Sequence, residues 1–209
     1  NMTELSKNDR LWLNNPVIMQ GVGLAPMVVA ATSGYTALVL AVAVAVMLTP
    51  TRVAGAVLRK ALGEQYDRFA VLCYALPAAL CYIAAYFLVR HLWGPSALQQ
   101  VGVYLPLLVF EPLIIRRYRA AVPEGPARAL RRGLYTTVGY LVVLLGVGLA
   151  RELLAQGSLM GVQLLEVQLF PLAAQPAGGF MLLGAVCAAW RGRVRAFKRN
   201  IYQEVERNK

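Results

Sequence analysis

Residues 135–150 read YTTVGYLVVLLGVGLA, an apolar run without one charged side chain. A helix of about 20 apolar residues crosses the hydrocarbon core of a bilayer. The whole chain shares this character, since 58% of its 209 residues are hydrophobic, only 15% are charged, and the mean hydropathy is +0.55. A soluble domain carries about a quarter charged residues. The composition therefore predicts an all-α integral membrane protein.

Together with the apolar runs on both sides of it, this run predicts six transmembrane helices in a single membrane domain that covers residues 1–209. The last helix is expected to open at Pro176 and to end at the basic residues after Trp190. The six spans are predicted at about 16–33, 35–58, 68–90, 97–115, 134–154 and 176–190.

Basic residues divide unevenly between the two sides that six spans create. All Lys and Arg residues except Arg90 and Arg151 fall on the side of the two termini. Cytoplasmic loops of membrane proteins carry an excess of Lys and Arg. We therefore predict a multi-pass membrane protein with both termini in the cytoplasm. The net charge of +11 is explained by basic residues beside membrane lipid, so we do not expect nucleic acid as a partner.

Six spans divide into two halves of three, and the two halves have opposite orientations. This arrangement predicts two inverted three-helix repeats, as in many transport folds. Glycine and proline interrupt the leading span of each half, so helices 1 and 4 are predicted to be broken. The helix breaks are placed at Gly21, Gly23, Pro26 and Pro106. Paired broken helices indicate a site near the midplane, and the alternative is that the prolines only kink the helices.

Glu111 is the most informative charged residue, because an acid at membrane depth is costly and is a functional candidate. It is our candidate for the ion path. The alternative is that it lies near the cytoplasmic end of span 4 and reaches toward Arg116 or Arg117. Pro112 removes a backbone donor, which leaves the carbonyl near Leu108 without its usual partner.

The remaining chemistry-bearing residues indicate no catalytic residue and no metal site. The three cysteines fall inside apolar runs and lack metal-ligand spacing, which indicates small buried side chains: Cys73, Cys81 and Cys187. Arg151 and Glu152 end span 5, where a local charge pair or an interface contact is expected. The sequence contains no phosphate loop and no Ser-His-Asp arrangement that its pattern supports.

Several motifs in chain order resemble those of one family of membrane subunits. The family contains the E subunit of Rnf complexes, the D subunit of the sodium-pumping NADH:quinone reductase, and their inverted partner subunits. The motifs are Asn14-Asn15-Pro16 with Gln20 and Gly23-Leu24-Ala25-Pro26, then Gly102–Val109, then Arg151-Glu152-Leu153-Leu154 with Gly157-Ser158-Leu159, and then Pro176–Phe180. The resemblance covers nearly the whole chain.

The resemblance implies a six-span subunit that pairs with a homologous inverted six-span subunit. In the family the two subunits together hold an iron–sulfur cluster in the membrane, expected to be of the 2Fe–2S type, through cysteines on the broken helices. The complex carries flavins (FMN and FAD) and further iron–sulfur clusters. It moves electrons between ferredoxin and NAD, or from NADH to quinone, coupled to sodium or proton movement.

This sequence departs from the family pattern at both cluster-ligand positions. Ala25-Pro26 stands where the family has Cys-Pro, and Glu111-Pro112 stands where it has Asn-Cys. Alanine and proline supply no thiolate, which is the ligand of such clusters. We therefore expect no ligand of the usual kind from this chain at Ala25 or Pro112. Three alternatives follow: the cluster is absent, partner residues alone hold it, or another electron route replaces it.

The sequence thus predicts a membrane subunit of an Rnf-type electron-transport and ion-transport translocase. The chain is expected to bind no cofactor alone and to act with the other subunits of the complex rather than as a catalyst by itself. Two alternatives stay open. One is a stand-alone small transporter built from an inverted repeat, and the other is a purely structural membrane subunit.

Overall fold

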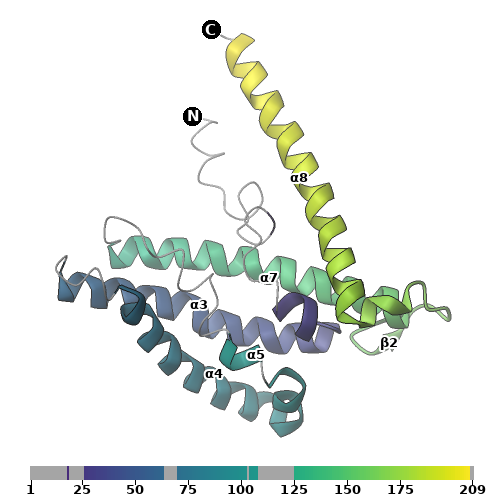
Figure 1. Cartoon of the computed structure of the whole chain (residues 1–209), viewed down its shortest axis with the longest axis horizontal. Helices are drawn as coiled ribbons and strands as arrows, with labels where there is room; N and C mark the ends of the chain where they lie inside the picture. The colour runs from purple at the N-terminus through teal and green to yellow at the C-terminus, as the bar shows by residue number, and fades with distance from the viewer. Residues whose placement is uncertain (1–17, 19–25, 64–69, 103, 108–124, 208–209) are drawn as a thin grey trace.

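The computed structural model describes residues 18, 26–63, 70–102, 104–107 and 125–207. These residues are mostly helical, as the sequence predicted. Three helices in this part of the chain are long and apolar enough to cross a membrane: α3 (Gly34–Leu62), α4 (Ala70–Val101) and α7 (Pro126–Gln156). They lie in one group, with α8 (Pro176–Arg207) extending away from them (Figure 1).

Helix α3 is the centre of this group and packs against both α4 and α7. Small residues let the backbones approach closely, as they do between membrane helices in general. A Cβ on Gly55 would overlap the ring of Tyr74 in α4, and one on Gly148 would overlap Ala37. Where α3 meets α7, the hydroxyls of Thr49 and Thr137 share a hydrogen bond of 2.8 Å.

The start of α3 is fixed by a capping box. The Ser33 hydroxyl accepts the backbone N–H of Thr36, and the Thr36 hydroxyl accepts the backbone N–H of Ser33. Such a box satisfies two donors that the first turn of a helix leaves open. The helix ends at Gly63, whose positive φ of 78° suits glycine. The residues predicted as the second span, 35–58, lie within this helix.

Helix α4 contains a sharp break at Gly94, where φ is 78° and ψ is −177°. The following residue, Pro95, has no backbone N–H and cannot continue the hydrogen-bond ladder. The break lies between the predicted third span, 68–90, and the predicted fourth span, 97–115. After this break the chain is helical to Val101, and it is helical again in the short α5 (Tyr104–Leu107). The later part of the predicted fourth span lies outside the described residues.

Helix α7 begins earlier than the predicted span at 134–154. Gly125 precedes it and Pro126 takes the first position, where a missing N–H does no harm. Its 31 residues correspond to roughly 46 Å at about 1.5 Å per residue, which is longer than the hydrocarbon core of about 30 Å. The helix ends at Gly157 in the left-handed conformation, with φ of 71°.

The segment after α7 is a small hairpin followed by one helical turn. Strands β1 (Ser158–Leu159) and β2 (Val162–Gln163) pair antiparallel, and Met160 and Gly161 form the turn with positive φ. The 3₁₀ turn η5 (Pro171–Ala174) then leads into α8. A short π-helical turn, η1 (Pro26–Ala30), precedes α3 and contacts the start of α8.

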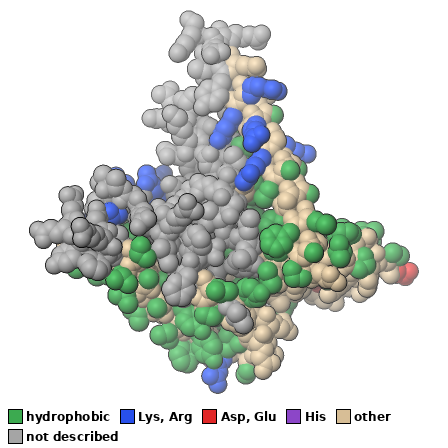
Figure 2. All heavy atoms as spheres, viewed as in Figure 1, with side chains coloured by type: hydrophobic (Ala, Val, Ile, Leu, Met, Phe, Trp, Pro, Cys, Tyr) green, Lys and Arg blue, Asp and Glu red, His purple; other side chains and the backbone are tan. Residues whose placement is uncertain are grey.

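Helix α8 begins at Pro176, as predicted, but runs on to Arg207 rather than ending near 190. Basic residues end an apolar run without ending a helix, because Arg and Lys are good helix formers. Its uncharged part, 176–190, is shorter than the roughly 20 residues that a span needs. Figure 2 shows Lys and Arg side chains gathered along the outer part of α8.

Candidate functional site

Two charged side chains that are neighbours in sequence are both buried at the end of α7. Arg151 is 0% exposed and Glu152 is 3% exposed. Burying a charge is costly unless hydrogen bonds compensate it, and this holds strongly near a membrane. The hydrogen-bond partners of Arg151 and Glu152 therefore show which groups this site binds.

The Arg151 guanidinium donates to five backbone carbonyls in two other segments. Nη1 donates to the carbonyls of Val28 (2.5 Å) and Ala31 (3.0 Å), which lie in η1 and directly after it. In η5 and just after it, Nε and Nη2 donate to three further carbonyls: Ala173 (2.9 Å), Ala174 (3.3 Å) and Gln175 (3.3 Å). The planar guanidinium carries five N–H donors, so it can satisfy several carbonyls at once.

The Glu152 carboxylate accepts from the start of α3 and from the hairpin. Oε2 accepts the backbone N–H of Gly34 at 2.6 Å. Oε1 accepts the backbone N–H of Gly161 at 2.9 Å and the Ser158 hydroxyl at 3.2 Å. The N–H of Gly34 is one of the donors that a helix start leaves unpaired, and a negative charge is favourable there.

Two glycines make room for these side chains. A Cβ on Gly179 of α8 would lie 2.9 Å from the guanidinium carbon of Arg151 and 3.0 Å from the Val28 carbonyl oxygen. A Cβ on Gly34 would lie 3.0 Å from the Glu152 carboxylate and 2.8 Å from the sulfur of Met160. A side chain at Gly179 would crowd a backbone oxygen, whereas one at Gly34 would displace the ends of neighbouring side chains, including the Glu152 carboxylate.

A second arginine holds the same N-terminal segment from α8. Arg191 Nε donates to the backbone carbonyl of Ile18 at 2.6 Å, and Ile18 is 0% exposed. Arg191 therefore binds a carbonyl that precedes residues 19–25, and Arg151 binds carbonyls that follow them. We call the following residues, together with the backbone groups they bind, the helix-1 junction: Arg151, Glu152, Gly34, Gly179 and Arg191.

Comparison with known proteins places the chain in a family. Residues 5–187 match the family model described as Rnf-Nqr subunit, membrane protein. The chain belongs to the Rnf-Nqr family. This confirms the resemblance that the sequence motifs indicated.

Three curated relatives of this Rnf-Nqr chain carry the same name, that of the E subunit of an ion-translocating oxidoreductase complex. The protein from Pseudomonas paraeruginosa is 34% identical over 86% of this chain and 80% of its own length. A protein from Pseudomonas aeruginosa is 33% identical over 88% of this chain and 82% of its own length. One from Buchnera aphidicola is 24% identical over 95% of this chain and 93% of its own length.

The predicted helix breaks and ligand positions of this Rnf-Nqr chain fall mostly outside the described residues. This applies to Gly21, Gly23, Ala25, Glu111 and Pro112. Two others lie within them. Pro26 is the first residue of η1, so the backbone is irregular where the first break was predicted. Pro106 lies in α5 and is exposed.

The described residues offer no iron–sulfur ligand set. No group of three or more His, Cys, Asp or Glu side chains lies together in this part of the chain. Cys73 is buried in α4, and Cys81 in α4 and Cys187 in α8 are half-buried. These residues do not fit a cluster of their own, and we derive no electron-transfer step through one.

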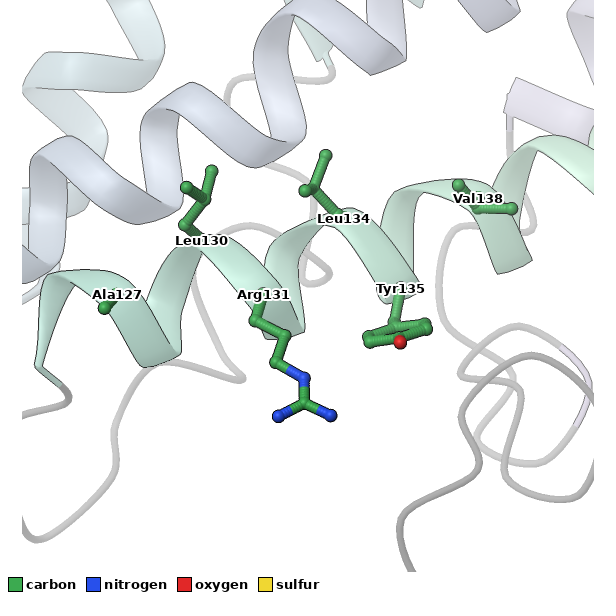
Figure 3. A pocket seen from close by; sticks show the side chains of 6 residues that line it. All are labelled: Ala127, Leu130, Arg131, Leu134, Tyr135 and Val138. Carbon is green, nitrogen blue, oxygen red and sulfur yellow. The ribbon is translucent and has the colours of Figure 1, made fainter.

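A hollow of about 430 Å³ lies along α7, away from the helix-1 junction. Six residues of the helix line it: Ala127, Leu130, Arg131, Leu134, Tyr135 and Val138. Arg131 and Tyr135 project from the same side of the helix (Figure 3). Apart from the Arg131 guanidinium and the Tyr135 phenol the lining is apolar, which is compatible with contact to lipid or to another helix. The guanidinium and the phenol do not form an acid–base pair, so we assign the hollow no catalytic role.

The structure gives Arg151 and Glu152 more distant partners than the local charge pair that the sequence suggested. Their hydrogen bonds reach across 120 and 118 residues, to Ala31 and Gly34. The available signals were the charged pair directly after an uncharged span and the Gly178-Gly179 pair at the start of α8. Neither signal identifies which backbone groups are bound.

Proposed function

We propose that this chain is the E-type membrane subunit of an Rnf-type complex that couples electron transfer between ferredoxin and NAD to sodium or proton translocation. The observation that carries the proposal is the family match over residues 5–187, together with relatives that are named as the E subunit of an ion-translocating oxidoreductase complex. Its partners are then the other subunits, including a homologous inverted six-span subunit. Flavins and iron–sulfur clusters belong to those partners.

The proposed topology is one membrane domain of six spans, in two inverted halves, in the bacterial inner membrane. The three long apolar helices α3, α4 and α7 support it. The uneven distribution of Lys and Arg supports cytoplasmic termini. Under this proposal the hairpin after α7 faces the outer side.

The helix-1 junction has a positioning role in this proposal. It binds backbone carbonyls at Ile18 and at Val28 and Ala31, on either side of Ala25. Ala25 is the position where the family has a cluster ligand. We propose that the chain thereby fixes a broken first span next to the position of the family's cluster ligand, although Ala25 itself supplies no ligand. Glu111 is our proposed contributor to the ion path.

Purification of the tagged full-length chain from its native membrane tests the proposal. We expect it to bring with it redox subunits that contain flavin and iron–sulfur centres. Proteoliposomes of the purified complex should take up sodium or protons when ferredoxin and NAD are supplied. A lone homodimer that transports a solute without redox partners would instead establish the transporter alternative. Copurification without any effect of this chain on ion uptake would leave it a structural subunit.

Iron and acid-labile sulfide analysis of the same complex addresses the missing cysteines. We expect no cluster that depends on ligands from this chain at the usual positions. A stoichiometric intramembrane cluster that is lost when residues of this chain are replaced would contradict that expectation, while it would leave the proposed membership of the complex intact.

A further inference from the structure

The hollow along α7 combines one cationic group with an apolar groove. Four of the residues that line it are 46–51% exposed: Leu130, Leu134, Tyr135 and Val138. The fifth large side chain, that of Arg131, is exposed as well. Figure 3 shows Arg131 and Tyr135 on one side of the helix face and Leu130 and Leu134 on the other. The hollow is therefore open to a ligand that is charged at one end and apolar along its length.

The charge pattern of α7 places this hollow at the edge of the hydrocarbon core. The uncharged run of the helix begins at Tyr135, and Arg131 lies one turn before it. Helix α7 is longer than the hydrocarbon core is thick, so its first turns extend beyond the hydrocarbon when it spans a bilayer. Tyrosine and basic residues are typical of helix ends at the lipid headgroups. Arg131 therefore lies at headgroup level, whereas Val138 lies among acyl chains.

The basic residues at this end of α7 have no acidic counterpart in the two helices that pack together here. Helix α3 contains no Asp or Glu, and α7 contains none before Glu152. Arg128 and Arg131 are both exposed on α7, and Arg59 and Lys60 lie in the last turn of α3. Negative charge must come from outside these two helices, and Arg131 presents its guanidinium to an external anion.

The apolar part of the hollow continues along α7 into the predicted membrane span. Val138 and Val142 are one turn apart and are 47% and 58% exposed. An acyl chain can lie along this row and cover it. At the other end, a guanidinium binds a phosphate through two parallel hydrogen bonds, and the Tyr135 hydroxyl can donate another. A soluble acidic protein would match the guanidinium but not the apolar row inside the span.

We propose that the hollow is a binding site for an anionic phospholipid, whose phosphate is bound by Arg131 and Tyr135 and whose acyl chain lies along Leu134 and Val138. A lipid with a net negative headgroup is preferred over a zwitterionic one, because Arg128 lies three residues before Arg131 and repels a headgroup ammonium. The site uses residues of α7 alone, so the inference does not depend on the proposed function.

Photocrosslinking identifies the lipid at this site. In the full-length chain, Val142 is replaced by a photoreactive phenylalanine analogue, and the protein is reconstituted in vesicles of equal parts phosphatidylglycerol and phosphatidylcholine. Mass spectrometry counts the crosslinked lipids by headgroup. We expect phosphatidylglycerol to exceed phosphatidylcholine at least about fivefold at position 142. Leu80 of α4, which is 69% exposed, is the matched position, where the two lipids should crosslink about equally.

Replacement of Arg131 in the same photoreactive protein tests the assigned contact. Arg131→Gln should bring the ratio of the two lipids at position 142 to about one, whereas Arg131→Lys should keep most of the enrichment because it keeps the positive charge. Arg195→Gln, at an exposed arginine of α8, is the control and should leave the ratio unchanged. Equal crosslinking of both lipids in the unaltered protein, or an enrichment that survives Arg131→Gln, would overturn the proposal. A crosslink from position 142 to a second copy of the chain in place of lipid would overturn it as well.

The site also predicts a stability that depends on lipid, because a ligand that binds the folded state raises the unfolding temperature. In detergent without phospholipid, Arg131→Met and the unaltered chain should unfold at about the same temperature. Added phosphatidylglycerol should raise the unfolding temperature of the unaltered chain more than that of Arg131→Met. An equal rise in the two proteins would count against the site.

Discussion

Arg151 forms hydrogen bonds with two short segments, η1 and η5, that belong to none of the long helices. Its guanidinium binds carbonyls of η1 on one side and of η5 on the other. Each unsatisfied buried carbonyl costs about 1–3 kcal/mol, so a side chain that satisfies several of them has a large influence on stability. One of the two segments, η1, begins at Pro26, where a break in helix 1 was predicted.

Replacing Arg151 with Met should therefore lower the free energy of unfolding by roughly 3 kcal/mol, because it leaves several carbonyls without a donor. Lysine at the same position should restore only part of the loss, since it offers a compact charge rather than a planar fork of donors. Thermal unfolding of the purified protein in one detergent measures the effect. The control is Arg131→Met, an exposed arginine of the same helix, which should change stability by less than about 0.5 kcal/mol. Equal losses in the two Met variants would show that the carbonyl contacts contribute nothing.

Our prediction for ion movement concerns Glu111. Glu111→Gln removes the negative charge while it keeps the size of the side chain. If the carboxylate contributes to the ion path, as we propose, ion uptake driven by electron transfer should fall at least about tenfold, because glutamine carries no negative charge. Ion uptake and electron transfer are measured together in proteoliposomes. Glu166→Gln, an exposed acid outside the long helices, is the matched control. Unchanged coupled uptake in Glu111→Gln would exclude the role.

At the scale of the elements, apolar runs located the helices but not their ends. The run at 135–150 and the Pro176 start are found where the sequence placed them. Helix α7 nevertheless begins at Pro126, and α8 continues to Arg207. Charged residues indicate where the lipid-facing part of a helix ends, whereas capping residues and glycine indicate where the helix itself ends. The contacts of Arg151 and Glu152 could not be predicted, because they join segments more than 100 residues apart through backbone atoms that carry no sequence signature.

Helix α8 gives a test of packing at the junction. Gly179→Ala places a methyl group against the Arg151 guanidinium and the Val28 carbonyl, neither of which can move freely. We expect a loss of about 1–3 kcal/mol, as for other overpacked sites. Gly184→Ala in the same helix meets nothing within 4 Å and should be neutral or stabilise by up to about 1 kcal/mol, because alanine favours helix. Thermal unfolding of both variants checks the prediction, and a Gly179→Ala protein as stable as Gly184→Ala would refute it.

For the whole molecule, the buried position of Arg151 strengthens the argument from charge. The sequence placed only Arg90 and Arg151 among the basic residues on the outer side. Arg151 is 0% exposed and donates to backbone carbonyls, so it serves the interior and not a surface loop. In the predicted topology Arg90 is then the one exposed basic residue on the outer side, which favours the predicted orientation.

This bias predicts where reporter domains should function. Green fluorescent protein fused after Lys209 should fluoresce, because it folds in the cytoplasm. Alkaline phosphatase fused after Gln163 should be active, since it needs the oxidising outer compartment to form its disulfides. The same enzyme fused after Gly63, between α3 and α4, should be inactive. In the predicted topology three spans, an odd number, separate Gly63 from Gln163, so activity at both positions is incompatible with that topology. Alkaline phosphatase activity in a fusion after Lys209 would contradict the predicted cytoplasmic C-terminus.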